Sequence, residues 1–266
     1  MSLGASDISH VGDDLVPRLG VDSADSSLAL WSLVTAAFGR KPQVWFRYIG
    51  GEFATDQSEI AWLHSNDCAV GLVYNEAFEN DVCGPQSVGE EHARNAIRAL
   101  KKLGAPAGVT VFCDIESSWS PSAEFIIGWA DTLAASPYSP GVYCNPNVTA
   151  VQIALSTEAA VSANVTNMPI WSAESEPGGA PTVPAWNPIG YGNFYVGVWQ
   201  WQENWNGVDC DLVTDNFTGL WEHALWLPSC TVRFLRLLAR MKISCILQQL
   251  YRDSSAMQQW PERQFL

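Results

Sequence analysis

Two acidic residues at the end of one predicted strand are the strongest candidates for chemistry in this sequence. The run Val-Phe-Cys-Asp-Ile-Glu contains Asp114 and Glu116, and strand alternation places both carboxyl groups on the same face as Phe112. Burying two acids on one face costs free energy unless they have a partner or a function. Such a pair at the carboxyl end of an interior strand could carry general acid–base catalysis.

Three further acids are expected near the same place. Asp22 ends the first predicted strand, and Asp209 and Asp211 share one face of the eighth. In a closed eight-stranded barrel the first and eighth strands are neighbours, so Asp22 and Asp209 are predicted to lie close together. Crowded carboxylates raise one another's pKa, which keeps one of them protonated near neutral pH.

The alternative for all these acids is that they form ion pairs or cap helices. Asp25 and Ser26 stand directly before a helical pattern and fit the capping interpretation. Ion pairs are limited by the charge balance, because residues 1–227 hold 8 Lys and Arg against 26 Asp and Glu. Arg47 is the one base of this part that falls inside a predicted strand.

Aromatic side chains follow a similar distribution. Four of them fall at or near the carboxyl ends of predicted strands: Trp171, Trp199, Tyr74 and Tyr143. Flat rings at such positions could stack on sugar faces, although a Trp inside a strand more often belongs to the core. Trp199 shares a face with Trp201, and Gln200 shares the other face with Gln202, and periodicity does not decide which pair faces the interior.

Short strand patterns that alternate with helical patterns would position these residues. The predicted strands are Leu19–Ser23, Val44–Gly50, Ala69–Asn75, Val109–Glu116, Gly141–Asn145, Pro169–Ala173, Val196–Gln202 and Val208–Thr214. The predicted helices are Ser27–Phe38, Asp56–Ser65, Glu90–Leu103, Ser122–Ala135 and Asn147–Ala163. This alternation predicts a parallel sheet with right-handed crossovers that closes into a TIM-like α/β barrel of eight strands.

The barrel is predicted to be irregular, with helices mainly in its first five units. Ser175–Tyr195 is rich in Pro and Gly and has no helical period. Only Glu203–Gly207 separates the last two predicted strands, which is the length of a hairpin connection. We therefore expect the last part of the barrel to be mostly strand, with an antiparallel pair.

The charge distribution separates three parts of the chain. Residues 1–18 are interpreted as an N-terminal extension, 19–227 as the barrel, and 228–266 as a basic tail with 6 Lys and Arg against 2 Asp and Glu. The acidic body repels phosphate backbones, which argues against nucleic-acid binding. The tail is predicted to be a helix, which either docks on the barrel or does not belong to the same domain. Membrane contact through its basic face is the less favoured alternative.

Other chemistries find no support in the sequence. The seven Cys and four His lack zinc-ligand spacing, and Cys113 and Cys210 are predicted to be small buried hydrophobic residues in a reduced protein. Phosphate-loop, dinucleotide-binding and serine-hydrolase motifs are absent, so no metal and no cofactor are expected. The first residues lack the pattern of a signal peptide, and no apolar run is long enough to span a membrane.

Four ordered motifs resemble glycoside hydrolase family 25 lysozymes. They are Gly20-Val21-Asp22, Asp114-Ile115-Glu116, Trp199-Gln200 and Val208-Asp209. The stretch 19–222 is most similar to a related glycoside-hydrolase-like family, formerly called domain of unknown function 1906. It shares that family's Arg47-Tyr48 strand and its Leu-Gly-x-Pro sequence at 103–106.

The resemblance implies a function and a role for each acid. Glu116 would be the general acid, and Asp114, Asp22 and Asp209 would position the substrate and stabilise an oxocarbenium-like transition state. The residues predicted to contact the substrate are Arg47, Tyr74, Tyr143, Trp171, Trp199, Gln200 and Asp211. The substrate would be peptidoglycan, cut at the β-1,4 bond after N-acetylmuramic acid. Two alternatives stay open for the second step, which either an Asp or the substrate's own acetamido group would assist.

The same resemblance leaves a second function open. Asp211 stands where the lysozymes commonly have Asn, and the related family has no securely assigned activity. The alternative is therefore a non-catalytic glycan-binding or cell-envelope protein on the same barrel. Either function implies a monomer that works outside the cell or in the cell wall.

Overall fold

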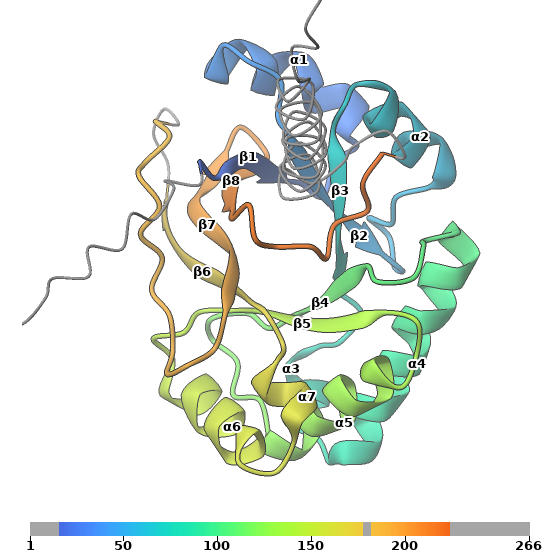
Figure 1. The fold of residues 1–266 in the computed structure, drawn as a ribbon, viewed down its shortest axis with the longest axis vertical. Coiled ribbons are helices and arrows are strands. Elements are labelled where there is room, and N and C mark those ends of the chain that lie inside the picture. The colour runs from blue at the N-terminus through green and yellow to red at the C-terminus, as the bar shows by residue number, and fades with distance from the viewer. Residues whose placement is uncertain (1–15, 178–181, 224–266) are drawn as a thin grey trace, which may run out of the picture. The chain divides into compact units, whose positions relative to one another are not determined.

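The computed structural model describes residues 16–177 and 182–223, and within them eight strands form a closed barrel (Figure 1). The strands follow one another around the barrel in sequence order: β1 (Arg18–Asp22), β2 (Val44–Ile49), β3 (Ala69–Tyr74), β4 (Thr110–Asp114), β5 (Ser139–Cys144), β6 (Ile170–Pro177), β7 (Val196–Trp205) and β8 (Val208–Val213). The predicted irregular TIM-like barrel is thus confirmed.

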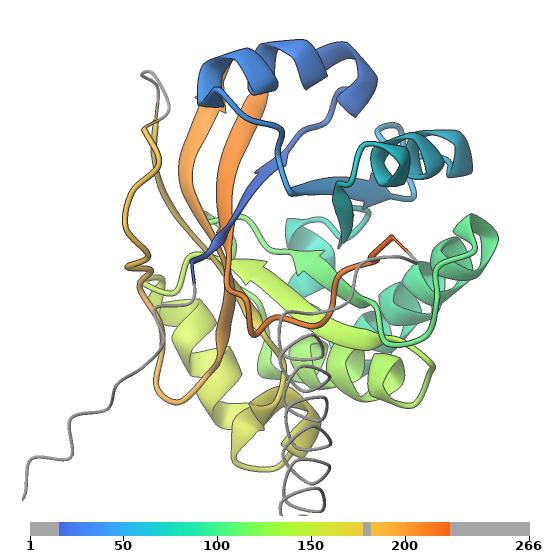
Figure 2. The same cartoon turned by 45° about the horizontal axis from the view of Figure 1, so that its top comes forward.

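The last strand breaks the parallel order. Each consecutive pair from β1–β2 to β6–β7 is parallel. Strand β8 closes the barrel between β7 and β1 and is antiparallel to both (Figure 2). Strands β7 and β8 form the expected hairpin, and β7 runs three residues beyond its predicted end. Asn206 and Gly207 make the turn, and both have positive φ (51° and 81°), as an Asn-Gly hairpin turn requires.

Helices fill the connections up to β6. They are α1 (Ser27–Phe38), α2 (Gln57–Ser65), α3 (Glu79–Val82), α4 (Gln86–Leu103), α5 (Ala123–Ala134), α6 (Thr149–Ala159) and α7 (Ala163–Thr166). The helix predicted for Asn147–Ala163 is present as the shorter α6, and a second short helix, α7, begins where the predicted helix was expected to end. Ser162 accepts a hydrogen bond from the Val165 amide and donates one to Asp131, which starts a new helix.

Apolar side chains form two layers of core, one inside the barrel and one between the barrel and the helices. Strand alternation separates them, since Phe46 on β2 points inward while its neighbour Trp45 packs in the outer layer. Phe46, Phe112 and Trp171 fill the interior with their rings in contact. Gly71 makes room for them, because a Cβ there would overlap the ring of Phe46.

Helices α4 and α5 approach so closely that their contact depends on two glycines. A Cβ added at Gly89 would lie 2.2 Å from the Phe125 carbonyl oxygen, and one at Gly128 would lie 2.2 Å from that of Gln86. We expect Gly128→Ala to lower the free energy of unfolding by about 2 kcal/mol, because the backbone must shift to admit the methyl group. Gly190→Ala is the matched control, since its nearest neighbour is 3.5 Å away. Equal denaturation midpoints for the two variants would contradict the close packing.

Several sequence predictions fall wholly or partly outside the described residues. The basic tail at 228–266 lies outside them, as does most of the N-terminal extension, so the predicted domain boundaries stay predictions. Within the described residues no helix is long and apolar enough to cross a membrane.

Candidate active site

A polar cavity of about 230 Å³ opens at the end of the barrel where β1 and β4 finish. Five acidic residues are among its lining: Asp22, Asp114, Glu116, Glu203 and Asp209. The rest of the lining consists of Tyr48, Val73, Tyr143, Trp171 and Asn204, so no Lys, Arg or His of the described residues contributes. The four acids predicted to act together therefore do meet at one mouth.

Strand pairing brings two of these acids together. Asp22 on β1 stands directly opposite Asp209 on β8, because β8 runs antiparallel and starts at the mouth. The Gln200 side-chain amide donates hydrogen bonds to both carboxyl groups, at 3.1 Å to Asp22 and 3.4 Å to Asp209. The Tyr143 hydroxyl donates to the Gln200 oxygen at 3.0 Å, which fixes the orientation of the amide.

Asp114 and Glu116 come from β4 and the segment that follows it. The strand ends at Asp114 rather than at Glu116, yet both side chains line the same cavity. Burial, with a contribution from the Glu116 charge, raises the pKa of Asp114 to about 7. Burial also raises the pKa of Glu116, and the charges of Glu203 and Asp209 add to it. Both groups are therefore suited to hold a proton closer to neutral pH than an exposed acid.

Burial is also the main cause of the raised pKa values of Asp22 and Asp209. It raises the pKa of Asp22, and the neighbouring charge of Asp209 adds to the effect, while the hydrogen bond from Gln200 opposes it. The pKa of Asp209 is raised by burial and lowered by a hydrogen bond from the Asn204 amide. The pKa values of Tyr48 and Tyr143 are raised by burial and by the surrounding acids, so both phenols stay neutral hydrogen-bond donors.

Three of the predicted substrate contacts are buried in the barrel interior and offer no open surface to a ligand. Asp211 and Gln200 are almost wholly inaccessible and lie outside the lining. Trp171 lines the cavity, but its ring is buried among Phe46, Phe112 and Tyr143, and its indole NH donates to Asp211 at 3.1 Å. This indole is therefore not an open platform for a sugar. Tyr143 does line the cavity.

Three other predicted contacts do not reach the cavity. Tyr74 lies in the outer core, where its hydroxyl is 3.1 Å from Nδ1 of His92. Trp199 packs edge-on against Trp186. Arg47 is buried in an ion pair with Glu59. In each case the adjacent residue of the strand faces inward instead, so strand alternation explains why these three side chains lie outside this cavity.

The sequence predictions missed four residues of the lining, one of which is the apolar Val73 of β3. Tyr48 follows Phe46 at the spacing of one strand face, which would have placed it inside the barrel. Glu203 and Asn204 belong to the β7–β8 hairpin, and the Asn204 amide donates to Asp209 at 2.6 Å. The Asn-Gly turn was the available signal, because it predicts that strand pairing continues to the residues beside the turn.

Arg47 and Glu59 form the centre of a buried polar network beside the first strand. The guanidinium lies 3.0 Å from the Glu59 carboxylate and donates to the backbone oxygens of Ser23 and Ala24, in the loop that follows Asp22. Glu59 also accepts hydrogen bonds from Ser27 at the start of α1. The network thus ties α1, α2 and the end of β1 together.

We expect Arg47→Met to lower the free energy of unfolding by about 3 kcal/mol, because it leaves the Glu59 carboxylate buried without its cation. Chemical denaturation measures the loss. Arg94→Met is the control, since Arg94 forms an exposed ion pair with Glu90 in α4 and its removal should cost about 0.5 kcal/mol. A similar loss of free energy of unfolding in both variants would show that the buried ion pair stabilises the fold no more than the exposed one.

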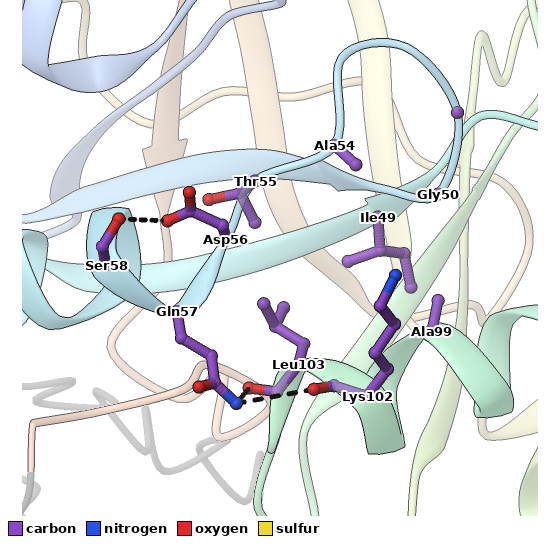
Figure 3. A pocket seen from close by; sticks show the side chains of 11 residues that line it. Ile49, Gly50, Ala54, Thr55, Asp56, Gln57, Ser58, Ala99, Lys102 and Leu103 are labelled. Carbon is purple, nitrogen blue, oxygen red and sulfur yellow. Dashed lines mark hydrogen bonds between the residues drawn. The ribbon is translucent and has the colours of Figure 1, made fainter.

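A larger cavity, of about 630 Å³, is lined by a different set of residues that includes none of these five acids. Figure 3 shows its lining. The cavity is enclosed by the β2–α2 connection and the end of α4, where Gln57 donates to the carbonyl oxygens of Lys102 and Leu103. The one carboxylate in its lining, Asp56, accepts a hydrogen bond from the Glu59 amide as the cap of α2. The concentration of acids, rather than size, therefore marks the smaller cavity as the candidate active site. Among the described residues no cluster of His, Cys, Asp or Glu is arranged to hold a metal ion.

An eight-stranded barrel with acids gathered at one mouth defines a glycoside hydrolase-like protein. The comparison with family models agrees, since residues 44–222 match the Rv2525c-like, glycoside hydrolase-like domain. The chain belongs to this family. No curated protein sequence matches the chain.

Solved structures with the same fold extend the comparison. A crystal structure of an uncharacterized protein from B. stearothermophilus is 26% identical, with a TM-score of 0.71 over 77% of this chain and 100% of that one. The Tat-secreted protein Rv2525c of Mycobacterium tuberculosis is 18% identical, with a TM-score of 0.53 over 78% and 100%. A bacterial lysozyme from Streptomyces coelicolor is 14% identical, with a TM-score of 0.45 over 75% and 93%, which is too distant to transfer residue roles.

Proposed function

We propose that the protein is a glycosidase that hydrolyses peptidoglycan at the β-1,4 bond after N-acetylmuramic acid. The observation that carries the proposal is the convergence of Asp22, Asp114, Glu116 and Asp209 on one cavity, where burial raises the pKa of each carboxyl group. Membership of a glycoside hydrolase-like family supports the same chemistry. Peptidoglycan lies outside the cytoplasmic membrane, so the proposed place of action is extracellular or in the cell wall.

The proposed mechanism divides the acids into two roles. Glu116 donates its proton to the oxygen of the leaving sugar while the glycosidic bond breaks. Asp114, Asp22 and Asp209 stabilise the positive charge that develops on the sugar ring. Either one of these aspartates or the acetamido group of the substrate then assists the attack of water.

Purified peptidoglycan provides the direct test. We expect the protein to release fragments with N-acetylmuramic acid at the new reducing end, identified by mass spectrometry after borohydride reduction. Fragments with N-acetylglucosamine at that end would contradict the proposed bond. Absence of cleavage on peptidoglycan from several sources and on chitin oligomers would contradict hydrolysis altogether.

A glycan-binding protein without hydrolytic activity is the second candidate. The raised pKa of Asp114, about 7, favours it, because a protonated aspartate stabilises a cationic transition state poorly. Retention on insoluble peptidoglycan without release of reducing ends, unchanged in Glu116→Gln, is the result that this candidate predicts.

A further inference from the structure

Asp211 is a wholly buried acid beneath the candidate active site, with 0% of its surface exposed. It projects from β8 into the barrel, opposite Gly20 of β1 and Gln200 of β7. Gly20 leaves the room that this side chain needs, since a Cβ at that position would lie 3.1 Å from the Cβ of Asp211. The Asp211 side chain therefore fills a space that the absence of a side chain at Gly20 leaves open.

The two oxygens of Asp211 differ in their surroundings. Oδ1 accepts the indole NH of Trp171 at 3.1 Å. Oδ2 is buried and accepts no hydrogen bond from the described residues. On the facing strand β1, Gly20 pairs with Asp211 and Asp22 pairs with Asp209, so Asp22 is the diagonal neighbour of Asp211 on the same face. Two carboxylates cannot bond to each other without a proton between them, so a hydrogen bond from Oδ2 to Asp22 requires one neutral acid in this pair.

The surroundings decide which of the two holds the proton. Asp22 borders the cavity and accepts a hydrogen bond from the Gln200 amide, which favours its anion. Asp211 has no contact with solvent, and the ionisable groups on its own face are Asp22 on β1 and Asp209 on β8, with Cys210 next to it on the opposite face of β8. Trp171 on β6 and Gln200 on β7 face it without charge. An anion at Asp211 would thus be buried next to other acids.

We propose that Asp211 is a permanently neutral carboxylic acid that donates a hydrogen bond from Oδ2 to Asp22 and so holds Asp22 as an oriented anion beside the cavity. Asp211 is then a positioning residue, and it acts as the Asn at this place would, with one acceptor and one donor. The importance of an anionic Asp22 rests on the proposed function. The protonation of Asp211 does not, and it is tested without substrate.

Burial raises the pKa of Asp211, and the charges of Asp22 and Asp209 raise it further. A carboxyl group with a raised pKa holds in the folded state a proton that the unfolded chain releases. Its contribution to stability is complete below the unfolded pKa, near 3.8, and is lost progressively as the pH rises above that value.

Asp211→Asn tests the proposal because the amide reproduces both hydrogen bonds and cannot titrate. We expect the melting temperature of the wild type to fall more steeply between about pH 4 and pH 7 than that of Asp211→Asn, by the equivalent of about one proton taken up on folding. Asp211→Leu, which cannot bond to Trp171 or Asp22, should be the least stable of the three. Asp25→Asn removes an exposed carboxylate of the β1–α1 loop and should follow the wild type.

Infrared spectroscopy adds a direct measurement. The wild type at pH 7 should show the C=O stretch of a protonated carboxylic acid, and the difference spectrum against Asp211→Asn should contain this band. Identical pH slopes for wild type and Asp211→Asn, or a difference spectrum without the band, would overturn the proposal. It would also be overturned if Asp211→Asn failed to fold while Asp25→Asn folded, because the amide should satisfy the same partners.

Discussion

Replacing Glu116 by glutamine should lower the rate of peptidoglycan hydrolysis by roughly 1,000-fold, the usual contribution of a general acid. The amide occupies nearly the same volume as the acid but has no acidic proton to give to the leaving oxygen. Glu116 is the candidate for this role because it lines the cavity with a raised pKa, caused first by burial and then by the charges of Glu203 and Asp209. The rate is measured as release of reducing ends per enzyme.

A matched variant separates catalysis from folding. Glu124→Gln makes the same chemical change at an exposed position of α5 and should keep the wild-type rate. Glu116→Gln should melt at or above the wild-type temperature, because removing a buried acid from a cluster of like charges relieves repulsion. Glu124→Gln should have a free energy of unfolding within about 0.5 kcal/mol of the wild type, as is usual for an exposed substitution. A Glu116→Gln protein that folds and cleaves within about tenfold of the wild-type rate would remove Glu116 from the mechanism.

The pH profile gives a second view of the same group. The general acid works only while it is protonated, so the rate should fall on the alkaline side as Glu116 loses its proton. Because the pKa of Glu116 is raised in the folded protein, this limb should lie at higher pH than an ordinary glutamate would give. A rate that rises steadily through neutral pH would contradict the assignment.

Asp114→Asn should stabilise the protein at neutral pH by up to about 4 kcal/mol and weaken its catalysis. The pKa of Asp114 is raised from 3.8 to about 7, mainly by burial, so the folded state holds a proton that the unfolded chain has lost. Each pKa unit corresponds to about 1.36 kcal/mol, and the destabilisation grows as the pH rises from about 4 to about 7. Asparagine removes this pH-dependent cost, because its amide does not ionise.

The comparison of wild type and Asp114→Asn by chemical denaturation should therefore depend on pH. The difference in free energy of unfolding should be small at pH 4, where Asp114 is protonated in the folded and unfolded states, and largest at pH 7 or above. Asp25→Asn, an exposed control, should show no such trend. Equal stability of Asp114→Asn and wild type at pH 7 would mean that Asp114 ionises in the fold at no cost.

The sequence was sufficient to predict the strand positions and the meeting of the acids. Hydrophobic runs separated by helical patterns located every strand to within a few residues, and barrel closure then required Asp22 and Asp209 to be neighbours. The inward direction of Asp114 follows from strand alternation. Asp114 shares a strand face with Phe112, and Phe112 belongs to the aromatic core inside the barrel.

The inward or outward direction of the other strand residues could not be predicted in the same way. Barrel strands are covered on both faces, so apolar residues occur at successive positions and the sequence gives no polar side to orient them. Arg47 shows the difficulty, because a charged residue in a strand suggests the open mouth. Its actual place is an ion pair between the barrel and α2, and the partner, Glu59, lies in a different element.

The site is complete only after the antiparallel eighth strand has paired with both of its neighbours. Asp22 belongs to the first strand and its bridging partner Gln200 to the seventh, 178 residues later in the chain. The Asp209 that faces it arrives only when β8 inserts between β7 and β1. Long-range pairings of this kind form slowly because the intervening chain must first be ordered. The acid cluster is therefore complete only when β8 pairs with both β7 and β1, and a chain cut before β8 would retain Asp114 and Glu116 but lack Asp209.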